Sequence, residues 1–196
     1  MKTLFVDFDG TICHDRFWRS LNDTEYAKIQ KILFTQNNEM VSDWMKGKYT
    51  AEEINKFVAI ETGIDYAQVW SVFQDDCKTM RIDSQIFELL ESLRDYYHLV
   101  LVTGNMDCFD RFTAPTLHLE KYFDEIVNSF NEQQLKTEEG GETFLKYLKG
   151  PIQKSYLIED SVNSCRVFSK LGGTALQVNP TTSAVFHLQH LINLEP

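Results

Sequence analysis

The chain has 196 residues, 43% of them hydrophobic, which is enough for one full core, so we expect one domain or one domain with an insertion. Its formal net charge of −10 disfavours nucleic acid and anionic membrane surfaces as partners, because both repel an acidic protein. No apolar stretch approaches a membrane span and no leader sequence is evident, which predicts a cytoplasmic protein.

The most informative stretch lies near the N-terminus, where the apolar run at residues 4–6 leads into Asp7 and Asp9. A strand places alternate side chains on one face, so both carboxylates project to the same side, and Gly10 lets the chain turn where they emerge. Neighbouring carboxylates repel each other and are costly to desolvate, which favours a metal ion or a shared proton. A solvated acidic turn would produce the same spacing, so other motifs must decide.

Residues 14–80 have the periodicity of helices. Apolar residues recur every three or four positions: Ile29, Ile32, Leu33, Met40, Val41, Trp44 and Met45. Thr50 and Glu53 form a capping box for a further helix, which Gly63 ends, and Asp65 is placed to cap another. We expect an α-helical insertion, and the aromatic residues of the segment belong to its core: Trp44, Trp70 and Phe73.

Four further apolar runs are typical of buried strands: residues 99–103, 125–128, 155–158 and 175–178. Helical segments separate them, and the alternation predicts a parallel sheet covered on both faces. The predicted fold class is therefore α/β, with a Rossmann-like open parallel sheet. Residues 1–13 and 81–196 form this core, and residues 14–80 interrupt it.

Such sheets bind ligands beyond the carboxyl ends of their strands, and polar residues stand at those ends. Thr103, Gly104 and Asn105 follow the second strand and suit a phosphate oxygen, although Thr103 also suits a helix cap. Glu159 and Asp160 follow a later strand and offer the oxygen ligands that Mg²⁺ prefers. Asp160 is equally placed to cap the next helix.

A bound phosphate also calls for a cation. Lys136 lies in the loop beyond the strand at 125–128, and therefore on the carboxyl side of the sheet. Lys154 opens a strand at the opposite edge, and Lys146 and Lys149 lie along a helix that returns toward that edge. Lysines are usually exposed to solvent, but topology favours Lys136 for the phosphate site.

Four motifs, taken in chain order, resemble those of the haloacid dehalogenase (HAD) superfamily of phosphohydrolases: Asp7-Phe8-Asp9-Gly10-Thr11, Thr103-Gly104-Asn105, Lys136 and Glu159-Asp160-Ser161. The resemblance spans nearly the whole chain, and its first and last motifs are the most specific. The proline that often follows the lysine is absent here. Many members carry a helical cap where this chain has residues 14–80.

The resemblance implies a role for each motif. The residue matching Asp7 is a nucleophile that forms an aspartyl-phosphate, and the residue matching Asp9 is a general acid and then a base. Mg²⁺ would be held by Asp7, the main-chain carbonyl of Asp9 and Asp160, with Glu159 close by or bound through water. The remaining phosphate oxygens would be held by the other motif residues: Thr103, Gly104, Asn105 and Lys136.

This similarity implies a Mg²⁺-dependent phosphohydrolase that cleaves a small phosphorylated metabolite. Members that remove halide lack an acid where Asp9 stands, so its presence favours the phosphatase and phosphomutase group. A phosphomutase of the β-phosphoglucomutase type and a low-activity phosphate-sensing or partner-binding protein remain alternatives. A phospho-acceptor receiver domain uses similar residues, but it has no reason for a long helical insertion.

Substrate specificity is expected to come from the insertion, whose entry carries His14, Arg16 and Trp18. His14 stands where many relatives have an acid, which makes specificity harder to transfer. Arg16 or Arg19 would suit an anionic substrate, although an exposed arginine on a helix needs no function.

Overall fold

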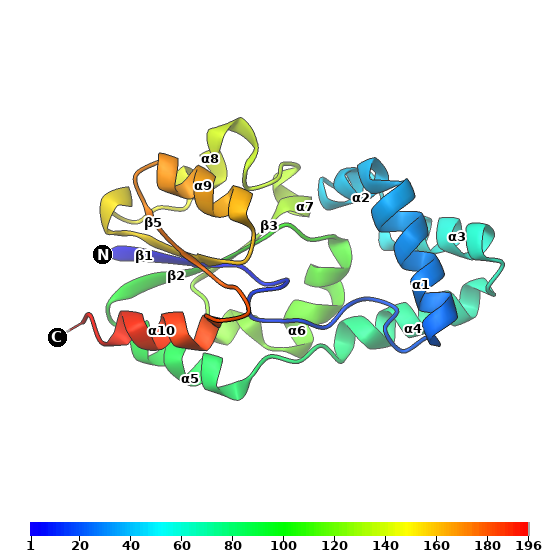
Figure 1. Cartoon of the computed structure of the whole chain (residues 1–196), viewed down its shortest axis with the longest axis horizontal. Coiled ribbons are helices and arrows are strands. Elements are labelled where there is room, and N and C mark those ends of the chain that lie inside the picture. Colours follow the sequence, from blue (N-terminus) through cyan, green and yellow to red (C-terminus); the bar gives the residue numbers. More distant parts are fainter. Residues whose placement is uncertain (196) are drawn as a thin grey trace.

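The computed structural model describes residues 1–195 and contains one five-stranded parallel sheet (Figure 1). Its strands are β1 (Lys2–Val6), β2 (Tyr97–Thr103), β3 (Glu125–Asn128), β4 (Tyr156–Glu159) and β5 (Thr174–Gln177). Their order is β3-β2-β1-β4-β5, and every neighbouring pair is parallel. The predicted α/β class is confirmed. Because β1 lies between β2 and β4, the residues that follow these three strands meet at one edge.

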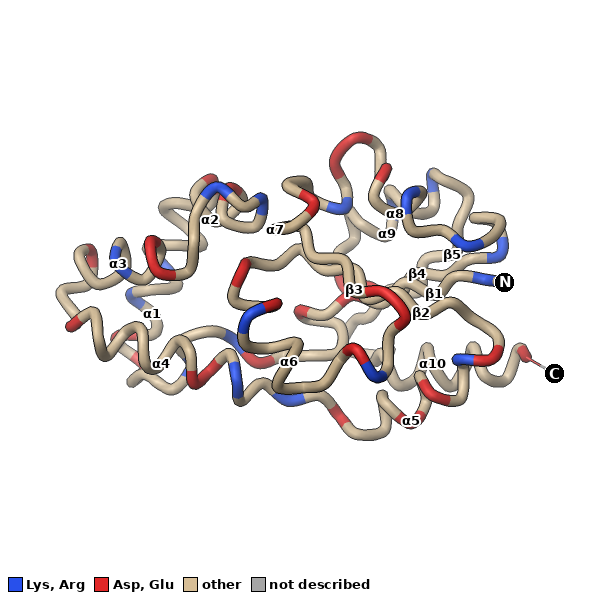
Figure 2. The backbone as a smooth tube through the Cα atoms, turned by 180° about the vertical axis from the view of Figure 1, so that it is seen from behind, with Lys and Arg blue, Asp and Glu red and all other residues tan. Residues whose placement is uncertain are grey.

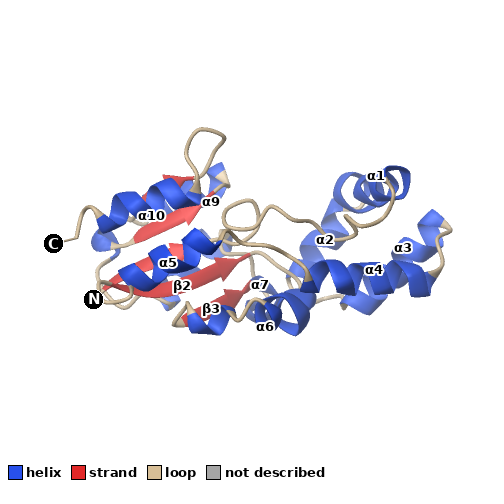
Figure 3. Cartoon of the chain, turned by 90° about the horizontal axis from the view of Figure 1, so that it is seen from below, coloured by secondary structure: helices blue, strands red, loops and turns tan. Residues whose placement is uncertain are grey.

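Helices cover both faces of the sheet. One face carries α5 (Ser84–Leu93) and α10 (Ala184–Ile192), and the other carries α8 (Glu142–Lys146) and α9 (Val162–Lys170) (Figures 1 and 3). The central strand serves both layers, since Leu4 and Val6 belong to the core cluster of α5 and α10. Phe5 instead packs edge-on against Phe144 and Phe168 of the other layer, with ring centroids 5.4 and 5.7 Å away. This alternation is the two-residue period of a strand buried on both faces.

The segment between β1 and α5 forms a helical layer beyond the carboxyl edge of the sheet (Figures 1 and 3). It consists of α1 (Asp23–Lys31), a π-helical turn (Ile32–Gln36), α2 (Asn38–Met45), α3 (Ala51–Thr62) and α4 (Tyr66–Lys78). The chain leaves the core after Cys13 and returns at Ile82, and these two residues form an antiparallel bridge.

The predicted local signals of the helical layer are confirmed. Thr50 and Glu53 make both hydrogen bonds of a capping box at the start of α3, and Gly63 ends that helix in the left-handed conformation, with a φ of 74°. Asp65 caps α4 by accepting a hydrogen bond from the backbone of Gln68. Of the predicted core aromatics, Trp44 and Phe73 are fully buried, and the half-buried Trp70 stacks on Phe73 at the edge of the same cluster.

Short helical segments complete the chain: α6 (Ala114–Thr116), α7 (Ser129–Glu132), a π-helical turn (Phe109–Thr113) and three 3-10 turns (Leu119–Lys121, Glu138–Gly140 and Ile152–Lys154). Within residues 1–195, no helix is both long and apolar enough to cross a bilayer. Basic residues are scattered among acidic ones along the backbone in the view of Figure 2.

Asp107, in the segment after β2, ties the helical layer to the core. Its carboxylate is almost fully buried and accepts hydrogen bonds from the Trp44 indole (2.9 Å) and from the backbone nitrogen of Ala51 (3.2 Å). Arg111 donates a hydrogen bond to the same carboxylate at 2.7 Å and another to Glu52 at 2.6 Å. The side chain of Asp107 thus joins α2 and the first turn of α3 to the segment that follows β2.

Replacing Asp107 by Ala is expected to lower the free energy of unfolding by about 2–4 kcal/mol, because three donors lose a buried charged acceptor. The matched variant Glu52→Ala removes only the half-buried, solvent-facing partner of Arg111 and should lower the free energy of unfolding by less than about 1 kcal/mol. Urea unfolding of both variants measures the difference. Equal effects would show that Asp107 does not anchor the layer.

Candidate active site

The turn after β1 connects the first acid to the last motif. The hydroxyl of Thr11 donates to Asp7 Oδ2 at 3.0 Å and accepts a hydrogen bond from the backbone nitrogen of Asp160 at 3.1 Å. Gly10 has a φ of 81°, and a Cβ at this position would collide with the Asp160 carboxylate. Only glycine therefore allows this close approach of the two loops.

Lys136 is the buried cation of the site. Its Nζ lies 2.5 Å from Asp7 Oδ1 and 2.6 Å from Glu159 Oε2, and it donates to the carbonyl of Val102 at 3.2 Å. Burial opposes the charge of Lys136, but Asp7 and Glu159 outweigh burial and raise its pKa above the ordinary value. Topology predicted the position of Lys136 on the carboxyl side of the sheet, and the structure has it there.

Asp7 and Asp9 have different surroundings. Burial raises the pKa of Asp7 to about 6, against the opposing attraction of Lys136. Burial, followed by repulsion from Asp7, raises the pKa of Asp9 to about 7. The Asp9 side chain is 35% exposed, and its Oδ1 lies 3.7 Å from the guanidinium of Arg16. The two neighbouring acids thus differ in ion-pair partner and in access to solvent.

Asn105, a predicted phosphate-binding residue, contacts Asp9 in this structure. Its side-chain amide donates to Asp9 Oδ2 at 2.6 Å, and its Oδ1 accepts from the backbone of Met106 at 3.0 Å. Its backbone nitrogen donates to the hydroxyl of Ser129, also at 3.0 Å. The side-chain amide of Asn105 therefore orients the carboxylate of Asp9. The sequence analysis did not single out Ser129. It lies directly after the strand at 125–128, so the search for polar residues at strand ends would have found it.

Unlike the side chain of Asn105, that of Thr103 has an unused hydrogen-bonding group. Its hydroxyl is buried at the end of β2 and has no hydrogen-bond partner among residues 1–195. A buried hydroxyl without a partner costs free energy, so Thr103 is free to bind an oxygen of a ligand. Gly104, the next residue, lines the cavities beside Asp9.

A group of three acids fits a hard divalent cation. Asp7, Glu159 and Asp160 each offer a carboxylate oxygen, and these atoms lie within 4.8 Å of one another. With Asp9 nearby, the site holds more negative than positive charge, and a divalent cation would offset the excess.

The three acids are not equally available. Glu159 is buried, its Oε1 accepts a hydrogen bond from the backbone of Ser161 at 3.0 Å, and its Oε2 pairs with Lys136. Asp160 is exposed and does not cap the following helix, because Ser161 caps α9 instead. Asp160 is therefore the most accessible carboxylate of the group.

Two adjoining cavities open beside these acids. One of about 280 Å³ is lined by residues that include Asp7, Lys136 and Asp160. The other, of about 300 Å³, lies against the helical layer. Asp9 and Gly104 line both cavities, so a ligand in the first has room to extend into the second past the side chain of Asp9.

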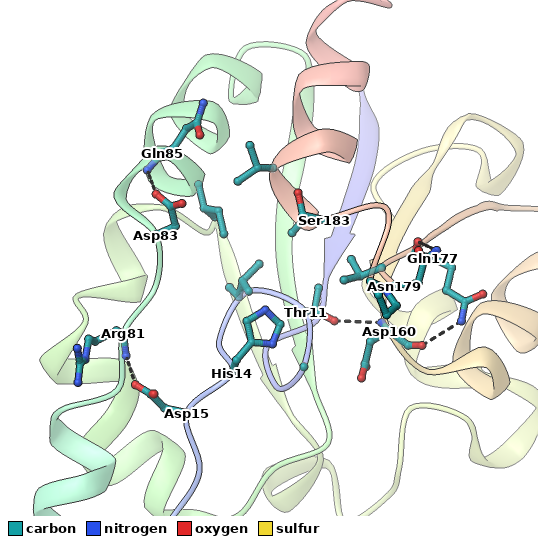
Figure 4. A pocket seen from close by; sticks show the side chains of 17 residues that line it. Thr11, His14, Asp15, Arg81, Asp83, Gln85, Asp160, Gln177, Asn179 and Ser183 are labelled. Carbon is teal, nitrogen blue, oxygen red and sulfur yellow. Dashed lines mark hydrogen bonds between the residues drawn. The ribbon is translucent and has the colours of Figure 1, made fainter. Parts of the chain in front are cut away.

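The predicted specificity residues separate in space. Arg16 lines the cavity against the helical layer. Trp18 is fully buried and donates its indole hydrogen to Asn55 at 3.0 Å, which corrects the expectation that it contacts substrate. His14 lines a different cavity of about 970 Å³ (Figure 4), whose lining includes Thr11 and Asp160 but none of Asp7, Asp9 or Lys136.

Comparison with known proteins decides the family. The family model of haloacid dehalogenase-like hydrolases matches residues 1–172. The chain belongs to this family. No match is found among curated proteins.

Solved structures of HAD proteins share the fold at low sequence identity. A HAD family enzyme from Bacteroides thetaiotaomicron, in complex with magnesium and inorganic phosphate, is 19% identical, with a TM-score of 0.70 over 91% of this chain and 94% of its own. A predicted HAD-like hydrolase from Porphyromonas gingivalis is 18% identical, with a TM-score of 0.72 over 98% of both chains. The L-2-haloacid dehalogenase from Xanthobacter autotrophicus, with chloropropionic acid covalently bound, is 12% identical, with a TM-score of 0.64 over 91% of this chain and 77% of its own.

Asp9→Asn is expected to stabilise the metal-free HAD protein in a pH-dependent way. Because the pKa of Asp9 is raised to about 7 in the folded state, protonated Asp9 favours folding at low pH. That contribution is lost as the pH rises from the ordinary carboxyl pKa of ~4 through about 7. Asn has no such titration, so its gain in melting temperature over the wild type should grow up to about pH 7 and then level off.

Thermal unfolding in EDTA across this pH range measures the gain. Asp95→Asn, at an exposed position, is the matched control and should show no such trend. A gain for Asp9→Asn that is constant with pH would contradict the raised pKa.

Proposed function

We propose that this HAD protein is a Mg²⁺-dependent phosphatase that cleaves small phosphomonoesters through an aspartyl-phosphate on Asp7. The observation that carries the proposal is the pair of differently held acids at one sheet edge. Asp7 is paired with Lys136, and Asp9 is held by Asn105 beside an open cavity. The environment of Asp7 suits an ionised nucleophile, and the environment of Asp9 suits a group that exchanges a proton.

The proposed reaction uses each acid in turn. The Asp7 carboxylate attacks phosphorus, and the bond between phosphorus and the leaving oxygen breaks. Asp9 gives its proton to that oxygen, so the alcohol departs neutral. Asp9 then takes a proton from water, whose oxygen attacks the phosphorus of the aspartyl-phosphate, and this releases inorganic phosphate and restores Asp7. A pKa near neutrality suits Asp9 for both proton transfers.

The surrounding residues would bind and orient the phosphate. Lys136 lies beside Asp7 and is placed to contact phosphate oxygens, and the free hydroxyl of Thr103 would donate to another. Asp7 and Asp160 would hold Mg²⁺, with Glu159 supporting the site through Lys136. The ion would supply positive charge that screens the phosphate from the acids. A HAD relative with this fold was crystallised with magnesium and inorganic phosphate.

Asp9 favours phosphate esters over organic halides. A halide departs as a stable anion and needs no proton, whereas an alkoxide leaving group does. In dehalogenation, an acid at this position, held by Asn105 and close to Arg16, would have no leaving group to protonate. We further propose that the helical layer, residues 14–80, acts as a cap that contributes the substrate-facing wall.

Asp7→Asn should lower kcat for phosphomonoesters by at least about 1,000-fold, because the amide is a poor nucleophile. The protein should remain folded by circular dichroism, since Asn keeps the shape of Asp. Steady-state phosphate release in Mg²⁺ measures the loss, with Asp95→Asn as the control of unchanged activity. Purified Asp7→Asn that keeps wild-type turnover would refute the proposed nucleophile.

Mg²⁺ should raise the melting temperature of the protein, because an ion that binds only the folded state stabilises it by ~3 kcal/mol at about 100 times its Kd. Asp160→Asn should remove most of this effect, since it replaces the exposed ligand with a neutral one. Thermal unfolding with Mg²⁺ and with EDTA tests this without reference to activity. An unchanged Mg²⁺ response in Asp160→Asn would place the ion elsewhere.

A further inference from the structure

The cavity against the helical layer has mostly apolar walls. Five of the side chains that line it are hydrophobic: Phe17, Phe34, Val41, Met45 and Met106. The cavity adjoins the proposed phosphate site through Asp9, so the part of the substrate that leaves as an alcohol would occupy it. Because this wall is apolar and lies next to the proposed proton donor, it would favour an apolar leaving alcohol over a polar one.

The two phenyl rings of this wall have different supports. Phe17 packs against Phe73 and Trp18, with ring centroids 5.3 and 6.0 Å away, so its position is fixed by the core of the helical layer. Phe34 lies on the π-helical turn and is 42% exposed. π-helical turns often occur at functional sites, and Phe34 leaves apolar surface on the cavity that a ligand would cover.

Few polar side chains face this space. Apart from Asp9, they are Arg16 and Gln30. Arg16 donates one of its guanidinium hydrogens to the carbonyl of Asp15 at 3.0 Å, and its charge lies beside Asp9. Among residues 1–195, Gln30 has no hydrogen-bond partner for its side chain, so its amide is free for one polar group of a ligand. A sugar ring has several hydroxyls, and most of them would lose hydrogen bonds to water without replacement here.

We propose that the preferred substrates are phosphomonoesters of compact, mainly apolar alcohols about one ring in size, and not sugar phosphates. The inference rests on the proposed phosphatase function, and it narrows the substrate class of the same site. The cavity of about 300 Å³ accommodates one ring, its apolar wall replaces water around the hydrocarbon, and Gln30 meets at most one or two polar substituents.

A pair of substrates matched in shape tests the inference. Cyclohexylmethyl phosphate and glucose 6-phosphate both carry the phosphate on a methylene group attached to a six-membered ring, and they differ mainly in hydroxyl groups. We expect kcat/KM for cyclohexylmethyl phosphate to be about 10-fold higher or more. Equal values, or a higher value for glucose 6-phosphate, would overturn the inference.

A variant of the apolar wall links the preference to this cavity. Phe34→Ser should lower kcat/KM for cyclohexylmethyl phosphate by about 5-fold or more, and should lower that for glucose 6-phosphate less, so the preference narrows. Phe186→Ser is the matched control, because Phe186 is a comparably exposed phenylalanine on α10, and it should leave the preference as in the wild type. A preference that survives Phe34→Ser unchanged would show that the cavity does not determine it.

Acetyl phosphate separates failure of the inference from failure of the proposed function, because its small acyl group needs no ring-sized cavity. If none of the three substrates is turned over in Mg²⁺, the phosphatase proposal fails. Binding then still tests the cavity, since the Asp7→Asn variant should bind cyclohexylmethyl phosphate about 10-fold more tightly than glucose 6-phosphate by calorimetry. Equal affinities in that measurement would overturn the inference independently of turnover.

Discussion

The structure depends on the concentration of negative charge at one edge of the sheet. Asp7 and Glu159 are buried there, and Asp9 and Asp160 stand beside them. Buried carboxylates are costly unless they are paired, and Lys136 pairs with two of them at once. This one cation allows strands β1 and β4 to lie side by side with an acid at the end of each.

The same excess of charge makes the site chemically useful. Burial and repulsion from Asp7 raise the pKa of Asp9 to about 7, and the nearby charges of Arg16 and Lys136 offset this only in part. A neutral hydrogen-bond donor, Asn105, holds Asp9 without removing its ability to carry a proton. The arrangement that costs folding free energy is therefore the one that would support the proposed proton transfer, and its excess negative charge would favour a divalent cation.

The segment that follows β2 joins the core to the helical layer. Asn105 contacts Asp9 in the core, Met106 belongs to the hydrophobic cluster of the helical layer, and Asp107 accepts hydrogen bonds from two of its helices. The Ser129 hydroxyl adds a further link between the two parts, because it accepts from the backbone of Asn105 and donates to the carbonyl of Met45 in α2. The acid of the core and the apolar wall of the layer are thus held by consecutive residues, so the shape of the cavity and the position of Asp9 are determined together.

The sequence alone determined the elements and the edge at which the site lies. Strand and helix periodicity are local, and parallel strands bring their carboxyl ends together, so Asp7, Thr103 and Asp160 were predictable. Tertiary structure decided the partners. Asn105 turns to Asp9, and Trp18 is buried against Asn55. Both outcomes depend on contacts between segments far apart in the chain. Such contacts leave no periodic signal, because the direction of each side chain is set by the neighbours that packing supplies.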